Sequence, residues 1–358
     1  MPLNLPRAAT GSTGEAIPVF DPFGVAADPD LPLLAQAVDP SEVQRQFEQR
    51  LTTLAGGSDS LRVQAIRVVR YKPHRRCMIE YDVEVDGPQA GRVVVTLLGK
   101  VRVHRFGNSG YRLLKALWQT GFDDKSDDGI SVPEPVGTVP AFQMWLQRKV
   151  PGSTATHLLS PAPPARTLVR RIAEAAHKLH EAGVAVERRH TIADELRILR
   201  ECLSKVAQTE PRWARRLERL VHECDRIGAS LPQQTAVGIH RDFYADQVIV
   251  DAGRLYLIDF DLYCEGDPGL DVGNFIGHIA EQSVRTHGDP EALAGLEQAM
   301  EDRFVELARE QRRAEVRAYA AFTLVRHIYL STRFPGRRAF TGRLLELAEF
   351  RVGSGSVR

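Results

Sequence analysis

The sequence has few of the features that mark secreted, membrane-spanning or disulfide-stabilised proteins. Four cysteines are scattered over 358 residues, and no two stand as a C-x-x-C metal or redox pair. Isolated thiols of this kind are typical of a reducing compartment, so we expect a cytoplasmic location. No apolar run reaches the roughly 18 residues of a membrane span, and the N-terminus lacks the pattern of a signal peptide. A membrane partner is therefore not expected.

An excess of charge of one sign is also missing. The chain holds 47 basic and 46 acidic residues, for a net charge of +1. Nucleic-acid-binding proteins usually carry a clear basic excess, so this balance argues against a nucleic-acid partner. The hydrophobic fraction of 43% is that of a globular protein, and the length allows two or three domains or one two-lobed unit.

The first part of the chain combines an irregular start with a β-rich region. Residues 1–58 are predicted to form an N-terminal extension with a helix over residues 41–54, which ends before Gly56. Residues 59–150 hold β-branched, partly alternating stretches that predict an antiparallel meander, interrupted by a helix over residues 111–120. The strands are expected at residues 63–71, 77–85, 92–101, 136–139 and 142–149.

The remainder, residues 151–358, is predicted to be mostly helical. Apolar residues recur there at the three- to four-residue spacing of amphipathic helices, and two short strands at residues 247–250 and 254–258 surround a turn. Helices are expected at residues 166–182, 194–206 and 213–227. The fold class is therefore α+β, with a small antiparallel β-rich lobe followed by a larger, mainly helical lobe.

The most informative segment reads HRDFYADQ over residues 240–247. Its spacing matches the H-R-D-x-x-x-x-N catalytic loop of kinases, with Gln247 in place of the asparagine. Asp259 follows at the end of an apolar strand. Phosphoryl transfer needs a group that orients and deprotonates the acceptor hydroxyl, and it needs oxygen ligands for Mg²⁺. Asp242 meets the first need, and Gln247 with Asp259 meets the second.

The specificity of this signal lies in its combination. An H-R-D tripeptide alone is common by chance, and a histidine such as His240 is often only a hydrogen-bonded core residue. The tripeptide, the spacing to Gln247, the two strands and the aspartate at a strand end are much rarer together. The joint pattern favours a phosphoryl-transfer site.

These residues resemble the aminoglycoside phosphotransferase and choline kinase group. That family's loop, H-x-D-x-x-x-x-N, is followed by I-D-[FW]-[DE] and D-P-x-x-D, and this chain reads IDFD over residues 258–261 and DPGLD over residues 267–271. The resemblance covers roughly residues 60–330. It implies a protein-kinase-like, two-lobed fold. The nucleotide-binding N-lobe would span residues 59–150, and residues 151–358 would form a C-lobe with the catalytic loop, metal site and acceptor pocket.

The short interval after Asp259 separates this chain from protein kinases. Asp271 opens the next helical stretch only a dozen residues later, which leaves no room for an activation segment with an A-P-E motif. The resemblance therefore implies a small-molecule hydroxyl acceptor: an amino sugar, a sugar, an amino alcohol or an antibiotic. Residues 240–275 hold eight acidic and two basic side chains, a net charge of −6. Such a segment attracts Mg²⁺ and is compatible with a cationic acceptor.

The resemblance implies a role for each matched residue. Asp242 corresponds to the catalytic base, and His240 would support the loop by hydrogen bonding. Asp259 corresponds to a Mg²⁺ ligand, with Gln247 as the expected second ligand. Asp271 corresponds to a residue that is mainly structural in the family.

The nucleotide-binding residues are less sharply marked. Lys100 ends a β-branched strand, where the phosphate-contacting lysine of kinase-like folds lies. The turn around Arg75 stands in the place of a phosphate-covering loop, although it is equally compatible with a solvated hairpin. In the family, adenine bonds to backbone groups of the hinge, which here implicates Arg148 and Val150. The expected nucleotide is ATP or GTP.

Two departures from the family pattern leave the function open. Gln247 is longer than asparagine by one methylene group, which moves its oxygen by about 1 Å, and shifts of that size lower rates strongly. No glutamate occurs between Glu84 and Glu134, so the usual partner of Lys100 is missing. The first hypothesis is an ATP-dependent small-molecule kinase of the aminoglycoside phosphotransferase type. The alternative is a catalytically weak or inactive relative that binds a nucleotide or metabolite as a regulator or scaffold.

Overall fold

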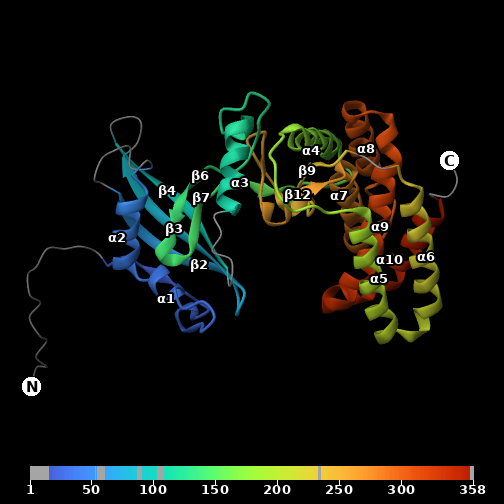
Figure 1. Cartoon of the computed structure of the whole chain (residues 1–358), viewed down its shortest axis with the longest axis horizontal. Helices are drawn as coiled ribbons and strands as arrows, with labels where there is room; N and C mark the ends of the chain where they lie inside the picture. The colour runs from blue at the N-terminus through green and yellow to red at the C-terminus, as the bar shows by residue number, and fades with distance from the viewer. Residues whose placement is uncertain are drawn as a thin grey trace, which may run out of the picture. The chain divides into compact units, whose positions relative to one another are not determined.

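The computed structural model divides into two compact units. Figure 1 colours the chain by residue number. It describes residues 16–52, 54, 61–86, 91–102, 109–232 and 235–354. Unit 1 comprises Met1–Tyr111 and Pro135–Lys149, and unit 2 comprises Arg112–Glu134 and Val150–Arg358. The division expected from the sequence differs over residues 112–134, which group with the helical unit. One reason is that Lys178 of unit 2 donates to the carbonyl oxygens of Gly121 at 2.6 Å and Ile130 at 2.9 Å.

A six-stranded sheet in the order β1-β2-β3-β4-β7-β6 forms most of unit 1. Its strands are β1 (Val19–Phe20), β2 (Arg62–Lys72), β3 (Arg76–Asp86), β4 (Arg92–Arg102), β6 (Pro135–Val139) and β7 (Met144–Arg148). The meander and the two later strands are confirmed. The sequence did not predict β1, which pairs in parallel with β2 through only two residues.

Two helices precede this sheet, α1 (Leu34–Ala37) and α2 (Pro40–Arg50). The side chain of Asp39 caps α2 by accepting the Glu42 amide at 2.8 Å. Phe47 of α2 is buried and meets the ring of Tyr81 on β3 edge-on, with centroids 4.9 Å apart. The predicted helix is therefore confirmed, but it ends at Arg50, and its expected stop at Gly56 lies outside the described residues.

Unit 2 is mainly helical and carries two small sheets. Its helices are α4 (Pro163–Glu181), α5 (Ile192–Thr209), α6 (Ala214–Ser230), α7 (Pro268–Gln282), α8 (Ala294–Ala308), α9 (Arg313–Arg333) and α10 (Thr341–Ser354). The division of the chain into units falls within helix α3 (Ser109–Leu117), and the π-helical turn that follows it (Trp118–Phe122) belongs to unit 2. One sheet has the order β5-β11-β10-β8, made of Ile130–Ser131, Arg254–Leu257, Val248–Asp251 and Ser153–Thr154. The other pairs β9 (Val237–Ile239) with β12 (Cys264–Gly266).

Helices α7 and α9 approach each other closely through glycines. A Cβ atom at Gly273 would lie 2.6 Å from the Val316 carbonyl oxygen, and one at Gly277 would lie 2.6 Å from the Thr323 Cβ. Only glycine permits this separation of the two backbones. The contact holds the helix that follows the catalytic loop firmly against α9. Within the described residues, no helix is long and apolar enough to cross a membrane.

Candidate functional site

The catalytic loop leaves β9 at His240 and is held by one buried carboxylate, that of Asp271. Asp271 on α7 has no exposed surface and accepts the His240 amide at 2.8 Å and the Arg241 amide at 2.6 Å. Arg241 adopts a left-handed conformation with φ of 71°, which is costly for a residue with a side chain. The two hydrogen bonds offset that cost and fix the backbone immediately before Asp242.

Three further side chains support Asp271 and the loop. His180 of α4 lies 2.9 Å from Asp271 through its Nε2 atom. Asn274, one turn after Asp271, donates to the Phe243 carbonyl at 2.9 Å. Arg326 of α9 in turn donates to the Asn274 side-chain oxygen at 2.5 Å. The sequence analysis missed these residues, although Asn274 stands three positions after the D-P-x-x-D motif and so on the same face of α7.

The predicted metal ligands lie on either side of the β10–β11 hairpin. Gln247 immediately precedes β10 and is 7% exposed, while Asp259 follows β11 in a left-handed conformation with φ of 61°. The Ile258 amide donates to the Gln247 carbonyl at 3.0 Å. His240 reaches the Ile258 carbonyl through Nε2 at 2.8 Å, a contact of the kind that its expected supporting role requires. The hairpin therefore brings Gln247 and Asp259 to one end of the small sheet.

The pKa of Tyr244 reflects the acidic residues near its ring. Its pKa is raised to about 12, first by burial and then by the charges of Asp242, Asp246 and Asp259, while a hydrogen bond with Gln247 acts in the opposite direction. The predicted base and the two predicted metal ligands thus share one neighbourhood. Carboxylate and amide oxygens are the ligands that Mg²⁺ prefers, so the donor set fits this ion.

The predicted nucleotide-binding residues lie at separate places along the chain. Lys100 belongs to β4, pairs across the strand with Trp145 of β7, and holds its ammonium 5.1 Å from the centroid of the Trp145 ring. Arg148 ends β7 in unit 1, and Val150 is the first residue of this part of unit 2. The chain passes from unit 1 to unit 2 between Lys149 and Val150, next to Arg148.

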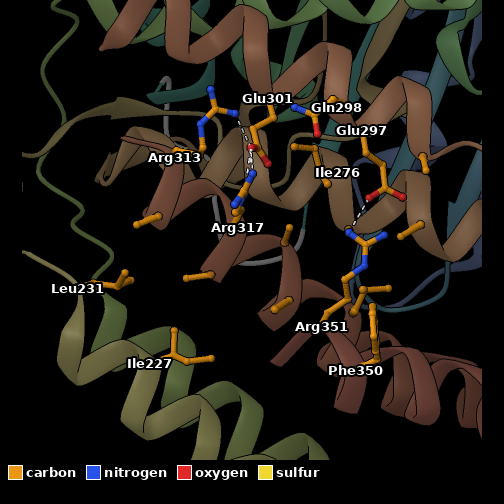
Figure 2. Close-up of a pocket in the computed structure, with 18 of the residues that line it drawn as sticks. Ile227, Leu231, Ile276, Glu297, Gln298, Glu301, Arg313, Arg317, Phe350 and Arg351 are labelled. Atoms are coloured by element: carbon orange, nitrogen blue, oxygen red, sulfur yellow. Dashed lines mark hydrogen bonds and ion pairs between the residues drawn. The ribbon is translucent and has the colours of Figure 1, made fainter. Parts of the chain in front are cut away.

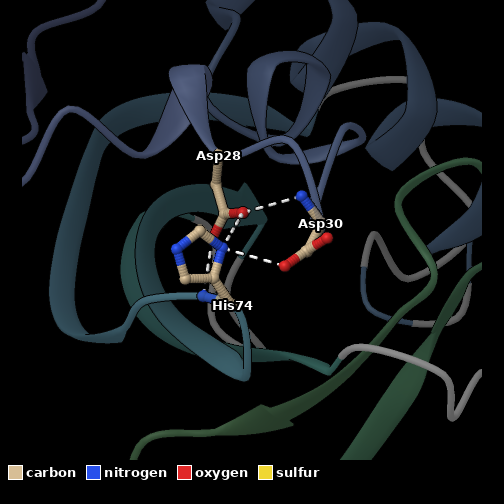
Figure 3. A group of neighbouring side chains, drawn as sticks. All are labelled: Asp28, Asp30 and His74. Atoms are coloured by element: carbon tan, nitrogen blue, oxygen red, sulfur yellow. Dashed lines mark hydrogen bonds and ion pairs between the residues drawn. The ribbon is translucent and has the colours of Figure 1, made fainter.

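Arg75 lies in the exposed β2–β3 turn, which a buried carboxylate of unit 1 holds in place (Figure 3). Asp28 is 5% exposed and accepts the Tyr71 hydroxyl at 2.8 Å and the His74 amide at 3.1 Å. His74, with φ of 57°, also places Nδ1 2.9 Å from Asp30. The ligand-type atoms of Asp28, Asp30 and His74 lie within 4.8 Å of one another. The Asp28 oxygens are already engaged, so the group serves to hold the turn.

Cations crowd the same turn. The pKa of Lys72 is lowered first by the charge of Arg76, then by burial, and then by Arg70 and Arg75. A group of like charges of this kind favours the approach of an anion.

A cavity of unit 2 lies elsewhere, between α6, α7, α8, α9 and α10 (Figure 2). It has a volume of about 760 Å³, and no residue of the catalytic loop lines it. Glu297 pairs there with Arg351 at 2.9 Å, and Glu301 pairs with Arg313 at 2.6 Å. Burial raises the pKa of Glu297 to about 7, although Arg351 opposes the rise. This cavity is lined by ion pairs remote in sequence from Asp242.

Comparison with known families decides the affiliation of the chain. The family described as "Phosphotransferase enzyme family" matches residues 83–319, which is more than half of the sequence. The chain belongs to this family. No curated protein sequence matches this phosphotransferase.

Solved structures similar to this phosphotransferase show the same fold at low identity. A spectinomycin phosphotransferase in complex with ADP and spectinomycin is 10% identical, with a TM-score of 0.55 over 89% of this chain and 99% of that one. A choline/ethanolamine kinase family protein from Mesorhizobium loti is 16% identical, with a TM-score of 0.53 over 73% and 85%. An aminoglycoside phosphotransferase with ADP and hygromycin B is 16% identical, with a TM-score of 0.53 over 86% and 98%. The predicted two-lobed, protein-kinase-like α+β fold is confirmed.

Proposed function

We propose that this phosphotransferase transfers the γ-phosphoryl group of ATP or GTP to a hydroxyl of a small molecule. The observation that carries the proposal is the Asp242 turn. Asp271 holds the two backbone amides before Asp242, and the charges of both Asp242 and Asp259 act on Tyr244. A fixed carboxylate beside further oxygen ligands is what phosphoryl transfer to an alcohol requires. The free cysteines accord with the cytoplasmic location that we include in the proposal.

In this mechanism Asp242 binds the acceptor hydroxyl and takes its proton as the oxygen attacks the γ-phosphorus. The bond between that phosphorus and the β,γ-bridging oxygen breaks, and the nucleoside diphosphate leaves. Because the preceding turn is fixed by Asp271, Asp242 needs little reorganisation to reach the hydroxyl. His240 acts as a positioning residue, since its ring joins the loop to the end of β11 through the Ile258 carbonyl.

Gln247 and Asp259 would hold Mg²⁺, which supplies charge neutralisation for the phosphates when it is bound. In unit 1, Lys100 and Arg75 would contact the phosphates, since both are cations and Arg75 lies in the cationic β2–β3 turn. The backbone groups of Arg148 and Val150 would bind the adenine or guanine base at the hinge.

A second candidate function rests on Gln247. This side chain is buried where the family has the shorter asparagine, so its amide oxygen has little freedom to compensate for the added methylene group. A protein with a displaced metal ligand that still binds nucleotide would act as a regulator or scaffold. Turnover of a hydroxylated acceptor at ordinary kinase rates would exclude this candidate, since typical kinases reach about 1–100 s⁻¹.

The experiment that tests the proposal separates binding from transfer. Thermal unfolding is measured with ATP or GTP, each with and without Mg²⁺, for the wild type, Asp242→Asn, Asp259→Ala and the surface control Asp225→Asn. A ligand at 100 times its Kd stabilises the folded state by about 2.7 kcal/mol. We expect a Mg²⁺-dependent shift that Asp259→Ala abolishes and Asp242→Asn retains.

Release of nucleoside diphosphate with acceptor mixtures is then measured on the same proteins. We expect Asp242→Asn to abolish transfer, while Asp225→Asn behaves as the wild type because Asp225 only pairs with Arg200 on the surface. Equal loss of nucleotide binding and transfer in Asp242→Asn would contradict the role of Asp242. No shift with millimolar nucleotide would contradict the proposed function as a whole.

A further inference from the structure

The backbone around Asp242 has two anchors, and both come from α7. On the N-terminal side, the Asp271 carboxylate accepts the two backbone amides that precede Asp242. On the C-terminal side, the Asn274 side chain donates to the Phe243 carbonyl oxygen at 2.9 Å. Positions 271 and 274 are three residues apart on one helix, so they lie on the same face. The backbone that carries Asp242 is therefore held on both sides.

An asparagine side chain can serve as such an anchor in only one of its two orientations. Its NH2 group donates, whereas its oxygen only accepts. A rotation of the Asn274 amide by half a turn would place an oxygen against the Phe243 carbonyl oxygen. Because Asn274 is only 1% exposed, its orientation is decided by the protein groups at the other end of the amide.

Two side chains of α9 contact the Asn274 oxygen. Arg326 donates to it from Nη2 at 2.5 Å, and the Thr323 hydroxyl donates at 3.1 Å. A hydroxyl can donate or accept, whereas a guanidinium has five N–H donors and no acceptor. Thr323 is thus compatible with either orientation of the amide. Arg326 is compatible only with the orientation that directs the NH2 group to Phe243.

The guanidinium of Arg326 is itself held at a second nitrogen. Its Nη1 atom lies 3.5 Å from Oε2 of Glu195 on α5, and Oε1 of the same carboxylate lies 2.6 Å from His190 Nε2. Glu195 is buried, and the Arg326 side chain is only 21% exposed. A planar guanidinium loses less conformational freedom for each hydrogen bond than a flexible ammonium does. Contacts with both α5 and α7 therefore hold the group that orients Asn274.

We infer that Arg326 is a positioning residue for phosphoryl transfer. Its guanidinium fixes the Asn274 amide, the amide fixes the Phe243 carbonyl, and this carbonyl fixes the backbone that follows Asp242. The inference rests on the proposed function and adds to it a residue outside the catalytic loop and outside the DPGLD motif. A displacement of about 1 Å in a catalytic group can lower a rate about 100-fold, so loss of the orientation should lower kcat. Arg326 contacts neither substrate in this role, so the KM values should stay the same.

The first experiment needs no substrate. Hydrogen–deuterium exchange of residues 240–247 is measured by mass spectrometry in the full-length wild type, Asn274→Asp and Arg326→Gln. A carboxylate at position 274 keeps an oxygen for Arg326 but cannot donate to Phe243, and a glutamine at position 326 no longer selects one orientation of the amide. We expect exchange of this segment to become about tenfold faster in both variants, because exchange reports local opening.

Two results of this experiment would overturn the inference. One is exchange of residues 240–247 at the rate of the wild type in both variants. The other is an equal acceleration in helix α8, because it would indicate a general loosening of unit 2 rather than release of the catalytic loop.

The second experiment measures kcat and KM with ATP, Mg²⁺ and an acceptor that the wild type uses. We expect kcat to fall about tenfold or more in Arg326→Gln and Asn274→Asp, while both KM values and the Mg²⁺-dependent thermal shift with ATP are retained. Arg326→Lys keeps a group that only donates, so it should recover most of kcat. Thr323→Val removes only the longer contact to the Asn274 oxygen and should lower kcat less than Arg326→Gln does.

Arg303→Gln is the matched control and should behave as the wild type. The Arg303 side chain is 28% exposed, and it pairs with Glu174 at 2.8 Å rather than with the Asn274 network. The kcat of each variant is divided by its folded fraction, which unliganded thermal unfolding gives, so that a loss of folded protein is not counted as a loss of rate. Equal kcat values in Arg326→Gln and Arg326→Lys, or a raised KM with unchanged kcat, would overturn the positioning role.

The two experiments keep this inference apart from the proposed function. Absence of nucleotide binding and of transfer in the wild type would remove the proposed function and, with it, the catalytic role of Arg326. Transfer by the wild type with an unchanged kcat in Arg326→Gln would leave the proposed function standing while the inference fails.

Discussion

Two turns of this phosphotransferase are held by the same device in very different surroundings. In unit 2, Asp271 accepts the amides of His240 and Arg241, the latter in a left-handed conformation. In unit 1, Asp28 accepts the amide of His74, which is also left-handed. Both carboxylates are enclosed, but the residues that they hold differ: His240 is buried, whereas the His74 side chain is 59% exposed.

The difference predicts how each turn responds to loss of its anchor. The turn at His240 and Arg241 is held by a carboxylate on α7, in the helical core of unit 2. The carboxylate that holds the β2–β3 turn is also enclosed, but the turn itself reaches solvent. We therefore expect loss of the anchor to cost more at the first turn, where water cannot replace the lost acceptor.

The largest effect is expected for Asp271→Ala. The change leaves two buried amides and the His180 ring without their acceptor, and breaking a buried charged network of this kind costs about 3–5 kcal/mol. Urea unfolding should show the loss. Asp225→Ala, which removes an exposed ion pair with Arg200, should cost under about 1 kcal/mol. Similar losses of unfolding free energy in the two variants would contradict the role of Asp271 as a buried anchor.

The two units are expected to respond to pH in opposite directions. The pKa of Glu297 in unit 2 is raised from 4.5 to about 7, mainly by burial, so the folded state holds the proton more tightly than the unfolded chain. Stability should therefore decline as pH rises from 4.5 to 7, by about 2–3 kcal/mol, and Glu297→Gln should flatten that decline. Urea unfolding at pH 5 and pH 7 measures this. An unchanged slope in the variant would count against Glu297 as its source.

In unit 1, burial alone would raise the pKa of Asp28, but hydrogen bonds from Tyr71, His74 and Asp30 outweigh it and hold the pKa below 3.8. The stability from Asp28 is therefore fully present above pH 3.8 and is lost as pH falls through the lower folded value. We expect Asp28→Asn to have a lower free energy of unfolding than the wild type at neutral pH, and this free energy to depend less on pH below 3.8. Acid unfolding followed by the fluorescence of Trp145 in unit 1 measures both. An acid transition identical to that of the wild type would show that Asp28 is not the source of this pH dependence.

A medium effect is expected for Asp28→Ala at neutral pH. The Tyr71 hydroxyl and the His74 amide lose their acceptor, but solvent reaches the turn, so the cost should be about 1–2 kcal/mol. The KM of ATP should rise while the acceptor KM stays constant, because only the turn that carries Arg75 is released. Asp30→Ala is the control, since the Asp30 side chain is 55% exposed and contacts only the His74 ring in this group, while its backbone amide, which donates to Asp28, is kept. Equal effects of the two changes would show that the buried carboxylate is not the anchor.

The smallest effects are expected for glycine at the two left-handed positions. Arg241→Gly and His74→Gly relieve backbone strain, and each should stabilise the fold by no more than about 1 kcal/mol. The benefit should be larger at Arg241, because at His74 the substitution also removes the contact with Asp30. Differential scanning calorimetry of both variants resolves the order. A reversed order would mean that the exposed turn is the more strained of the two.

The sequence predicted Asp271, which anchors the turn at His240 and Arg241, but not Asp28, which anchors the β2–β3 turn. The reason is physical. Asp271 belongs to the short motif DPGLD, whose position after the catalytic loop marks it. Asp28 meets Tyr71 across 43 residues and stands in a Pro-, Gly- and Asp-rich stretch with no periodicity. Likewise, the strands of unit 1 follow from alternation, whereas β1 is two residues long and exists only by pairing with β2. Contacts made by tertiary packing, such as those of His278 with Tyr244 and His327, leave no local pattern.

The glycine contact between α7 and α9 limits how substrate preference can evolve in this protein. At Gly273 a Cβ atom would lie 2.5 Å from the Tyr319 Cβ, so larger residues cannot enter without forcing the helices apart. The separation of the two helices therefore stays fixed when other residues are substituted. This holds for the side chains that they carry toward one another: Asn274 and His278 on α7, and Arg326 and His327 on α9. A change of acceptor preference would therefore come from replacing individual side chains on α7 and α9, and not from moving these helices.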